Sequence, residues 1–455
     1  MSTEHEARME KIVSLCKRRG FIFPSSEIYG GLNGVWDYGP MGVELKRHLK
    51  DFWWRRVVRE REDMVGMDGA ILMNRAVWQA SGHEQTFSDP MIDCKTCKGR
   101  FRADQIESIP CPQKPSKMVA SCEGDKTEPR DFNLMFTTHV GPMADDTNKT
   151  YLRPETAQAI FVQFRNVLET SRKKLPFGIA QIGKAFRNEI NPRNFIFRSR
   201  EFEQMEIEYF CAPSQGLELL DLWLEERLRF YEDIGIPRSK IHVKEIPDGE
   251  RAFYSLKTYD LEYEFPFGIQ ELEGVAYRTD YDLKQHMTHS GKPLDYFDEE
   301  SKEKFIPHVI EPSAGADRTV LALLCEAFEE QEVENEKGEK ETRTVLHFHP
   351  RMAPVKVGIF PLLKNKPDLV KKAHEIEKML RAHMMVFYDE SGAIGRRYRR
   401  QDEIGTPFCV TIDFETLGES GPQLANTVTL RERDSMKQHR IAIDELLGYL
   451  LGKIF

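Results

Sequence analysis

The amino-acid sequence predicts a soluble α/β protein with more than one domain. Its 455 residues are too many for one hydrophobic core, so two or three domains are expected. A strand, a turn and a second strand are indicated between Ile179 and Phe210. From Val355 onward strands alternate with helices, which is typical of a separate α/β domain of roughly 100 residues. These patterns place a domain boundary near residue 350.

Composition limits the class of protein. Apolar residues make up 40% and charged residues 31% of the chain, and no apolar run is long enough to span a bilayer. The N-terminal segment MSTEHEARMEKIVSL lacks the apolar centre of a signal peptide, so we expect a cytoplasmic location and no membrane partner. The net charge of −9 is weak evidence against a nucleic-acid partner, because phosphate is bound by local basic patches.

The first part of the chain predicts two amphipathic helices followed by an irregular insert. Residues 8–19 and the stretch from Met41 to Arg59 have the apolar periodicity of helices. Trp53 and Trp54 on the second helix suit a buried seam, either within the chain or at a dimer interface. Residues 84–135 then break the pattern.

Four of the eight cysteines lie in this insert, among many Lys, Pro and Ser residues. Cys94 and Cys97 form a C-x-x-C pair, whereas Cys111 and Cys122 are irregularly spaced. A compact zinc ribbon would normally show a second close pair. A structural Zn²⁺ site and unpaired thiols in a degenerate insert therefore both remain open. A disulfide framework is not expected in so large a chain.

The segment from Tyr151 to Thr156 leads into an amphipathic helix. Pro154 suits the first turn of that helix, and the helix dipole favours a carboxylate such as Glu155 there. Glu155 therefore has a structural explanation as well as a functional one. A further amphipathic helix is predicted from Ser214 to Gly235.

The stretch from Gln181 to Phe210 places arginines, carboxylates and an aromatic ring on two predicted strands. Side chains of one parity share a strand face, so Arg187 and Glu189 are expected together. A second set is expected to share a face of the second strand: Arg200, Phe202, Gln204, Glu206 and Glu208. Arginine binds phosphate through paired hydrogen bonds, and an aromatic ring can stack on a base. The hairpin is either one wall of a nucleotide site or a surface hairpin of mixed charge.

Residues 263–283 are predicted to form strands linked by glycine turns. Their carboxylates form a candidate site for a divalent metal or a solvated acidic edge: Glu271, Glu273, Asp280 and Asp282. Residues 308–330 lead from a strand through small residues into an apolar helix. Arg318 lies in the first turn of that helix, where the dipole disfavours a cation, so an anionic ligand would help to explain it.

The last part of the chain begins after a charged, low-complexity loop predicted at residues 329–341. The expected strands are Val355–Phe360, Phe408–Ile412 and Thr427–Leu430, and the expected helices are Pro367–Met385 and Ile443–Leu451. The basic run Arg396–Arg400 is either a solvated face or a phosphate contact.

Several of these segments resemble the single-polypeptide, homodimeric glycyl-tRNA synthetases, a family of class II aminoacyl-tRNA synthetases. GPMGVELKRHLKDFWWRR resembles motif 1, FRNE with the loop to REFEQME resembles motif 2, and GADRTVLALL resembles motif 3. The strings YLRPETAQ, QIGKAFRNEI, REFEQMEIEYF and EPSAGADR are specific to the glycyl family, and the resemblance covers nearly the whole chain. Ala159 is a departure, because the family usually has Gly after RPETAQ.

The resemblance implies a class II catalytic domain over residues 1–350, with a mixed, mainly antiparallel sheet flanked by helices and an insert at about 84–135. It implies an α/β anticodon-binding domain over residues 351–455. The expected enzyme is a homodimer that activates glycine with ATP, releasing pyrophosphate, and transfers it to tRNA(Gly). Mg²⁺ is the expected ion.

The family's site residues map onto matching positions of this chain. By resemblance, Arg187, Arg318 and Glu271 are catalytic. The ATP site is implied at Arg187, Asn188, Glu189, Phe197, Arg198, Ser199, Arg200, Glu201, Phe202, Glu271, Leu272, Gly315, Ala316, Asp317 and Arg318. The glycine site is implied at Arg102, Glu155, Phe202, Glu203, Gln204, Met205, Glu206, Arg278, Glu311, Pro312, Ser313, Ala314 and Gly315. No protein ligand set for a metal is implied.

Three other functions compete with this interpretation. Another class II ligase, such as a prolyl-, threonyl- or histidyl-tRNA synthetase, would share the fold but not the glycyl-specific strings. A non-catalytic paralogue, like the accessory subunits of some DNA polymerases, should have lost the phosphate arginines, yet Arg187, Arg200 and Arg318 are present. A generic ATP-binding regulator explains neither the carboxylates nor the appended domain.

Overall fold

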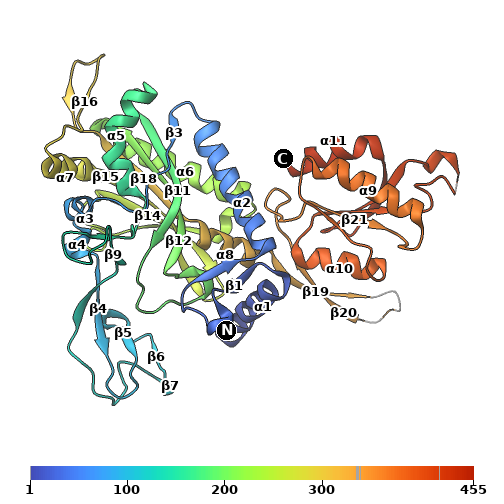
Figure 1. Cartoon of the computed structure of the whole chain (residues 1–455), viewed down its shortest axis with the longest axis horizontal. Helices are drawn as coiled ribbons and strands as arrows, with labels where there is room; N and C mark the ends of the chain where they lie inside the picture. Colours follow the sequence, from blue (N-terminus) through green and yellow to red (C-terminus); the bar gives the residue numbers. More distant parts are fainter. Residues whose placement is uncertain (1, 335–337, 339, 420) are drawn as a thin grey trace.

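The structure is a computed structural model that describes residues 2–334, 338, 340–419 and 421–455. Its largest sheet has seven strands in the order β13-β14-β15-β18-β12-β11-β3 (Figure 1). The strands are β3 Met64–Gly66, β11 Phe177–Phe186, β12 Glu201–Cys211, β13 Ile241–Glu245, β14 Lys257–Phe265, β15 Gly268–Thr279 and β18 His308–Gly315. Only the β3–β11 pairing is parallel within this sheet, so the predicted mixed, mainly antiparallel sheet is confirmed.

Helices pack on both faces of this sheet. The helices are α1 Ser2–Arg19, α2 Pro40–Trp54, α5 Ala157–Ser171, α6 Gly216–Asp233, α7 Tyr281–Ser290 and α8 Ala316–Ala327. One face carries the largest core, to which α1, α2, α6 and α8 contribute, whereas α5 and α7 pack on the opposite face around Phe164 and Phe210. Trp53 of α2 is fully buried in the chain's own core, so the predicted seam at this residue lies within the subunit.

Predicted helices and strands agree with the structure where the apolar pattern is long. The helix predicted from Met41 to Arg59 is α2 followed by a π-helical turn, Arg55–Arg59. The loop predicted at 329–341 is wrong over its described residues, which form a hairpin of β19 Phe328–Glu334 and β20 Lys340–Leu346. The charged side chains of this hairpin are largely exposed, while its Val345 and Leu346 are buried. A strand with one exposed face can carry many charged residues, so the high charge of this segment was wrongly interpreted as a loop. Residues 335–337 and 339 lie outside the described residues.

The insert predicted at about 84–135 projects away from the large sheet (Figure 1). It contains β4 Ser88–Asp93, β5 Arg100–Arg102, β6 Pro110–Cys111, β7 Lys114–Met118 and β8 Arg130–Asn133. The remaining short elements are β1 Ile22–Pro24, β2 Trp36–Tyr38, α3 Arg75–Ala80, α4 His83–Thr86, β9 Thr137–His139, β10 Lys149–Tyr151, β16 Tyr296–Phe297 and β17 Lys304–Phe305. Among the described residues, no helix has both the length and the apolar character needed to cross a membrane.

The C-terminal part forms a five-stranded sheet in the order β22-β21-β23-β24-β25, with a hydrophobic core of its own. Its elements are β21 Val357–Pro361, α9 Pro367–Arg381, β22 Val386–Tyr388, α10 Ile394–Ile404, β23 Phe408–Ile412, β24 Thr427–Glu432, β25 Gln438–Ala442 and α11 Ile443–Ile454. The sequence patterns missed β22, β25 and α10. Alternation of strands and helices around a separate core is the arrangement predicted for this part of the chain.

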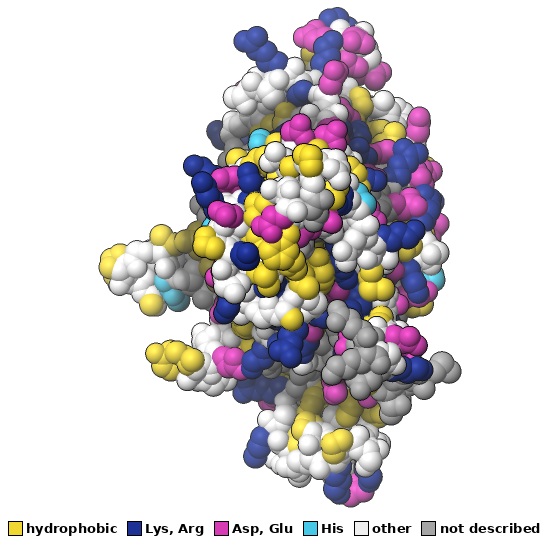
Figure 2. Space-filling view, turned by 90° about the vertical axis from the view of Figure 1, so that its right-hand side faces the viewer, with side chains coloured by type: hydrophobic (Ala, Val, Ile, Leu, Met, Phe, Trp, Pro, Cys, Tyr) yellow, Lys and Arg dark blue, Asp and Glu magenta, His cyan; other side chains and the backbone are white. Residues whose placement is uncertain are grey.

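The basic run Arg396–Arg400 lies on α10, and most of its arginines form hydrogen bonds to other groups of the same chain. Arg397 is buried, and Arg399 and Arg400 are paired with carboxylates. The partners are carbonyl oxygens of Pro361, Glu390 and Gly392 for Arg397, Glu341 for Arg399, and Asp389 for Arg400. Arg396 is exposed. Figure 2, which views the molecule from the side of this domain, shows lysines and arginines intermingled with carboxylates rather than one continuous basic surface.

Candidate active site

A pocket of about 290 Å³ opens on the sheet face that carries the even-numbered side chains of β12. Its predicted lining residues are Glu155, Arg187, Glu189, Phe197, Arg198, Ser199, Phe202, Gln204, Glu206, Glu271, Leu272, Arg278, Glu311, Ser313, Gly315, Asp317 and Arg318. The structure therefore brings together residues that are as many as 163 positions apart in the chain (Glu155 and Arg318). β12 and β18 lie side by side in the sheet, and alternate residues of each strand point to the same face. Residues that are distant in the sequence therefore meet on that face.

Guanidinium groups gather at one end of the pocket. Arg318 contacts the Glu271 carboxylate at 3.2 Å and lies 4.5 Å from the ring centroid of Phe197. Arg187 donates to the carbonyl oxygen of Pro154 at 3.0 Å, and its guanidinium is 5.3 Å from the Phe202 ring centroid. These contacts hold both guanidinium groups in place at the pocket wall, which is how a phosphate site is preorganised.

The charges at this end favour an anionic ligand. The cation of Arg318, followed by those of Arg187 and Arg198, lowers the pKa of Glu271. Burial, together with the cations of Arg193 and Arg318, lowers the pKa of Arg198. A cation whose neighbours are mainly cations is stabilised when an anion binds.

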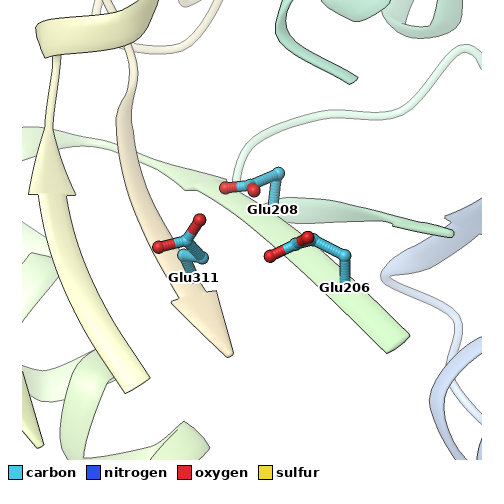
Figure 3. Close-up of side chains that lie close together, drawn as sticks. All are labelled: Glu206, Glu208 and Glu311. Atoms are coloured by element: carbon cyan, nitrogen blue, oxygen red, sulfur yellow. The ribbon is translucent and has the colours of Figure 1, made fainter. Parts of the chain in front are cut away.

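Carboxyl groups gather at the other end. Glu206 and Glu208 of β12 and Glu311 of β18 lie close together (Figure 3), and one carboxyl oxygen from each residue lies within 4.8 Å of those of the other two. The Thr156 hydroxyl donates to Glu206 at 2.6 Å, and Arg278 donates to Glu311 at 2.7 Å. Neither carboxyl oxygen of Glu208 has a hydrogen-bond partner, although the side chain is fully buried.

The protonation of these carboxyls differs from group to group. Burial raises the pKa of Glu311 to about 8 and raises that of Glu208 well above its usual range. Burial also raises the pKa of Glu206. Burial would raise the pKa of Glu155 too, but the neighbouring His83, at 3.3 Å, and Arg278 hold it below its usual range. This end holds more carboxyl groups than cations, so a small cationic ligand would stabilise their ionised forms.

Arg278 forms a rigid wall beside the carboxyls. Its guanidinium makes two hydrogen bonds of 2.8 Å to Asp282 and lies 4.0 Å from the Tyr254 ring centroid and 5.3 Å from that of Phe161. Stacking and a paired carboxylate together fix this side chain in one position.

A β-bulge explains why the predicted carboxylate run does not form one cluster. The β14–β15 register shifts at Leu261, so Glu262 pairs with Glu271 while Leu261 pairs with Glu273. The bulge re-aims Glu271 into the pocket, and Glu273 is buried on the opposite face against Arg227 at 2.6 Å. Asp280 and Asp282 pair separately with Lys284 and Arg278. The candidate metal site of these four carboxylates is therefore wrong.

Several predicted site residues do not present their side chains to the pocket. The group consists of Arg102, Asn188, Arg200, Glu201, Glu203, Met205, Pro312, Ala314 and Ala316. Strand parity places Glu203 and Met205 on the opposite face, where Glu203 contacts Lys46 at 2.8 Å and Met205 joins the core. Ala314 also faces that core.

Arg102 stays in the insert, where it contacts Asp89 at 2.8 Å and Asp104 at 2.7 Å. Arg187 and Glu189 both line the pocket, as expected from their sequence parity, although they follow β11, which ends at Phe186. The expected placement of Arg200 beside Phe202 on a strand face is wrong, because β12 begins at Glu201 and Arg200 does not line the pocket. Asp317 does line the pocket, but its carboxylate accepts hydrogen bonds from Lys46, at 2.7 Å, and from other neighbours.

The sequence patterns also missed lining residues. Ala252, Tyr254, Ser255 and Thr258 reach the pocket from a segment without regular periodicity and from the start of β14. Glu208 was placed correctly on the face of Glu206 but was not assigned a role. Only its parity could have signalled it, because the sequence does not show that its carboxyl is buried without a partner.

The fold and the two-ended pocket define a class II aminoacyl-tRNA synthetase. A family model described as tRNA synthetase class II core domain (G, H, P, S and T) matches residues 136–327, and one described as Anticodon binding domain matches residues 356–453.

Similar proteins of known name indicate which amino acid this class II synthetase family uses. The chain is 50% identical over 453 residues to "Glycine--tRNA ligase" of Treponema denticola, covering 99% of this chain and 98% of that protein. It is 50% identical to the same-named protein of Thermobifida fusca, covering 100% and 99% of the two chains, and 51% identical to that of Clostridium perfringens, covering 97% of each. The chain belongs to the glycine–tRNA ligase family, as the resemblance in its sequence predicted.

Proposed function

We propose that the pocket activates glycine with ATP and passes the glycyl group to the 3′ end of tRNA(Gly). The observation that carries this proposal is the polarity of the pocket, with guanidinium groups at one end and carboxyl groups at the other. Glycyl-adenylate has the matching polarity, because its phosphate is an anion and its ammonium is a cation.

The guanidinium end would bind ATP. Arg187, Arg198 and Arg318 would contact the phosphates, and the Phe202 ring would stack on adenine. Glu271 would neighbour Mg²⁺, which usually takes one or two protein carboxylates together with phosphate oxygens. The burial of Asp260 beside Glu271 raises the pKa of Asp260 to about 6, so the local chemistry suits a cation there. Bound Mg²⁺ would supply charge neutralisation of the phosphates.

Activation itself needs no protein base. A glycine carboxylate oxygen attacks the α-phosphorus, the bond from that phosphorus to the bridging oxygen breaks, and pyrophosphate leaves. The nucleophile is already ionised, so the arginines act by positioning the reactants and by neutralising charge on the phosphates. A terminal ribose hydroxyl of tRNA then attacks the adenylate carbonyl and gives up its proton, the bond from the carbonyl carbon to the phosphate oxygen breaks, and AMP leaves.

The carboxyl end would select glycine. Glu155, Glu206 and Glu311 would bind the ammonium, and the fixed Arg278 would stand where a larger side chain must go. An ordinary pocket distinguishes one methylene by only about 1–3 kcal/mol, so rejection of larger amino acids requires such a rigid wall.

The proposal extends to the rest of the chain. Residues 1–350 would form the catalytic domain and residues 351–455 would bind the anticodon region of tRNA. A homodimer is supported by exposed apolar side chains in the short 3-10 helix Glu27–Tyr29 between β1 and β2, where Ile28 is 88% and Tyr29 is 87% exposed. We expect the enzyme to act in the cytoplasm. Incorporation of radiolabelled glycine into tRNA(Gly) transcripts tests the overall reaction, and charging of tRNA(Pro) or tRNA(Thr) instead would refute it.

Arg396→Ala should weaken tRNA charging without altering glycine activation. Arg396 is the exposed arginine of the α10 run, and loss of one phosphate contact should reduce the slope of log affinity against log salt by about 1. Arg397→Ala is the matched comparison, because this buried side chain satisfies backbone carbonyls. It should lower the unfolding temperature instead. Equal losses of activation and charging in Arg396→Ala would show that Arg396 does not act through tRNA.

Glycine binding should strengthen as the pH rises from about 6 to 8. The pKa of Glu311 is raised to about 8, so this carboxyl is mainly protonated in the free enzyme at neutral pH. An ammonium ligand stabilises the ionised form, so binding releases a proton. Calorimetry of glycine binding in buffers of different ionisation enthalpy should detect this release. Proton uptake, or affinity that falls toward pH 8, would contradict the protonation of Glu311.

A further inference from the structure

The carboxylate of Glu155, which would bind the glycine ammonium, is held by two side chains from outside the pocket lining. The Gln158 amide donates to one carboxylate oxygen at 3.0 Å, and Gln158 is itself hydrogen-bonded to Asp282 and His286. Nε2 of His83 lies 3.3 Å from the other carboxylate oxygen. The side chains of His83 and Glu155 are only 13% and 14% exposed, so water weakens this contact little.

The His83 ring is fixed by its neighbours. It lies edge-to-face with Trp78, with 5.5 Å between the ring centroids, and its centroid is 5.3 Å from that of Phe87. On the side away from Glu155, Nδ1 lies 2.8 Å from the hydroxyl oxygen of Ser81. Trp78 and Ser81 are both buried. Ring packing and the contact at Nδ1 therefore direct Nε2 to Glu155.

Glu155 needs this contact to stay ionised. Burial would raise its pKa, and the charge and hydrogen bonding of His83 lead the causes that lower it, followed by the charge of Arg278. The carboxyls of Glu206 and Glu311 also face Glu155, and like charges repel. Because Arg278 donates its hydrogen bonds to other carboxyls, the ionised form of Glu155 depends mainly on His83.

The contacts of the ring also define which nitrogen carries a proton. An ionised carboxylate only accepts hydrogen bonds, so a bare Nε2 beside Glu155 would place two lone pairs against each other. The Ser81 hydroxyl can accept from Nδ1 while it donates to the Trp78 carbonyl oxygen at 3.4 Å, or it can donate to Nδ1. It suits both the doubly protonated ring and the neutral ring with its proton on Nε2. In both forms Nε2–H faces Glu155.

The segment that carries His83 also contacts the guanidinium end of the pocket. The Phe87 ring centroid lies 5.4 Å from the guanidinium of Arg187, which also lies 5.3 Å from the centroid of Phe202. Disruption of this segment would therefore disturb both ends of the pocket, whereas loss of the Nε2–H alone would disturb only the carboxyl end. The two cases differ in their effects on ATP and on glycine.

We propose that His83 is a positioning residue that aims the Glu155 carboxylate at the glycine ammonium through its Nε2–H. The inference rests on the proposed function of Glu155, and His83 itself would contact neither glycine nor ATP. His83 and Gln158 each hold one carboxylate oxygen, so the carboxylate is prevented from rotating. Each oxygen keeps a further lone pair for the ligand, and the site is preorganised before glycine binds.

His83→Asn and His83→Gln separate hydrogen-bond donation from packing. The amide nitrogen of Gln is as many bonds from Cα as Nε2 of His, whereas that of Asn is as many as Nδ1, so only Gln can present a donor to Glu155. In glycine-dependent pyrophosphate exchange, we expect His83→Asn to raise the KM for glycine about 10- to 100-fold, because a hydrogen bond to a charged group is lost. His83→Gln should recover most of this loss. In both variants the KM for ATP should change little.

His242→Asn is the matched control, because it removes a half-exposed ring whose Nε2 lies 2.9 Å from Glu264, outside the pocket. It should leave both KM values unchanged. Equal rises in the KM for glycine in His83→Asn and His83→Gln would show that His83 acts only by packing, and would overturn the inference. So would a KM for ATP that rises as much as that for glycine, or an unchanged KM for glycine in His83→Asn.

Ser81→Ala gives a test that does not depend on the folding of the His83 variants. It keeps the ring and removes only the hydroxyl that fixes it, so the KM for glycine should rise about 2- to 10-fold while that for ATP stays the same. No rise, or equal rises for both substrates, would contradict the role of the ring. Exchange by the unaltered chain that does not require glycine would refute the proposed function instead.

Discussion

Arg318→Ala should lower the rate of glycine-dependent exchange of pyrophosphate into ATP by about 10²- to 10³-fold. The side chain is held at the pocket wall by Glu271, at 3.2 Å, and by the Phe197 ring, so its charge is preorganised for the phosphates. Because it would act on charge that moves during the reaction, kcat should fall much more than the KM for glycine rises.

Two comparison variants make this result specific. Arg318→Lys keeps the charge but loses the planar fork, so it should recover only part of the rate. Arg165→Ala removes an exposed arginine that pairs with Glu169 on α5, and it should leave the rate unchanged. Full activity in Arg318→Ala would remove Arg318 from the proposed phosphate site.

Glu206→Gln should raise the KM for glycine by about 100-fold, because a buried ammonium would lose a charged partner worth roughly 3 kcal/mol. The KM for ATP should change little, since the guanidinium end is intact. Glu206 is fully buried, accepts a hydrogen bond from Thr156 and lies in the pocket, so the amide should keep the shape while losing the charge.

Glu208→Gln is the matched control for this variant. Neither carboxyl oxygen of Glu208 has a hydrogen-bond partner, and burial raises the pKa of Glu208 well above its usual range, which favours the neutral form that an amide imitates. Steady-state exchange kinetics on both variants should show a large effect on glycine for Glu206→Gln and a small one for Glu208→Gln. Equal effects would mean that the carboxyl cluster acts as one charged unit, contrary to the protonation assigned to Glu208.

Much of the pocket could be predicted from strand parity. The alternation of Phe202, Gln204 and Glu206 in the sequence is the alternation that lines the pocket, because β12 is regular throughout. The same regularity places Glu203 and Met205 on the other face, although the family resemblance had grouped them with the glycine site. In β12, therefore, the odd or even position of a residue along the strand predicted the direction of its side chain better than its place in a family motif did.

Other parts could not be predicted because they depend on long-range pairing. The bulge opposite Leu261 separates Glu271 from Glu273, and nothing in either strand's sequence marks it. Tyr254, which stacks on Arg278 at 4.0 Å, comes from an irregular segment. The arginine run on α10 was predicted as one possible basic patch, but Arg397 is buried and donates to carbonyl oxygens, one of which belongs to Pro361, 36 positions away in the chain.

Pyrophosphate exchange into ATP, measured in the presence of each of the twenty amino acids, tests the two-ended pocket most directly. The polarity of the pocket and the wall at Arg278 predict exchange that depends on glycine, with alanine supporting at most about one hundredth of that rate. Exchange that depends on another amino acid, or that proceeds equally well without glycine, would contradict the proposed site.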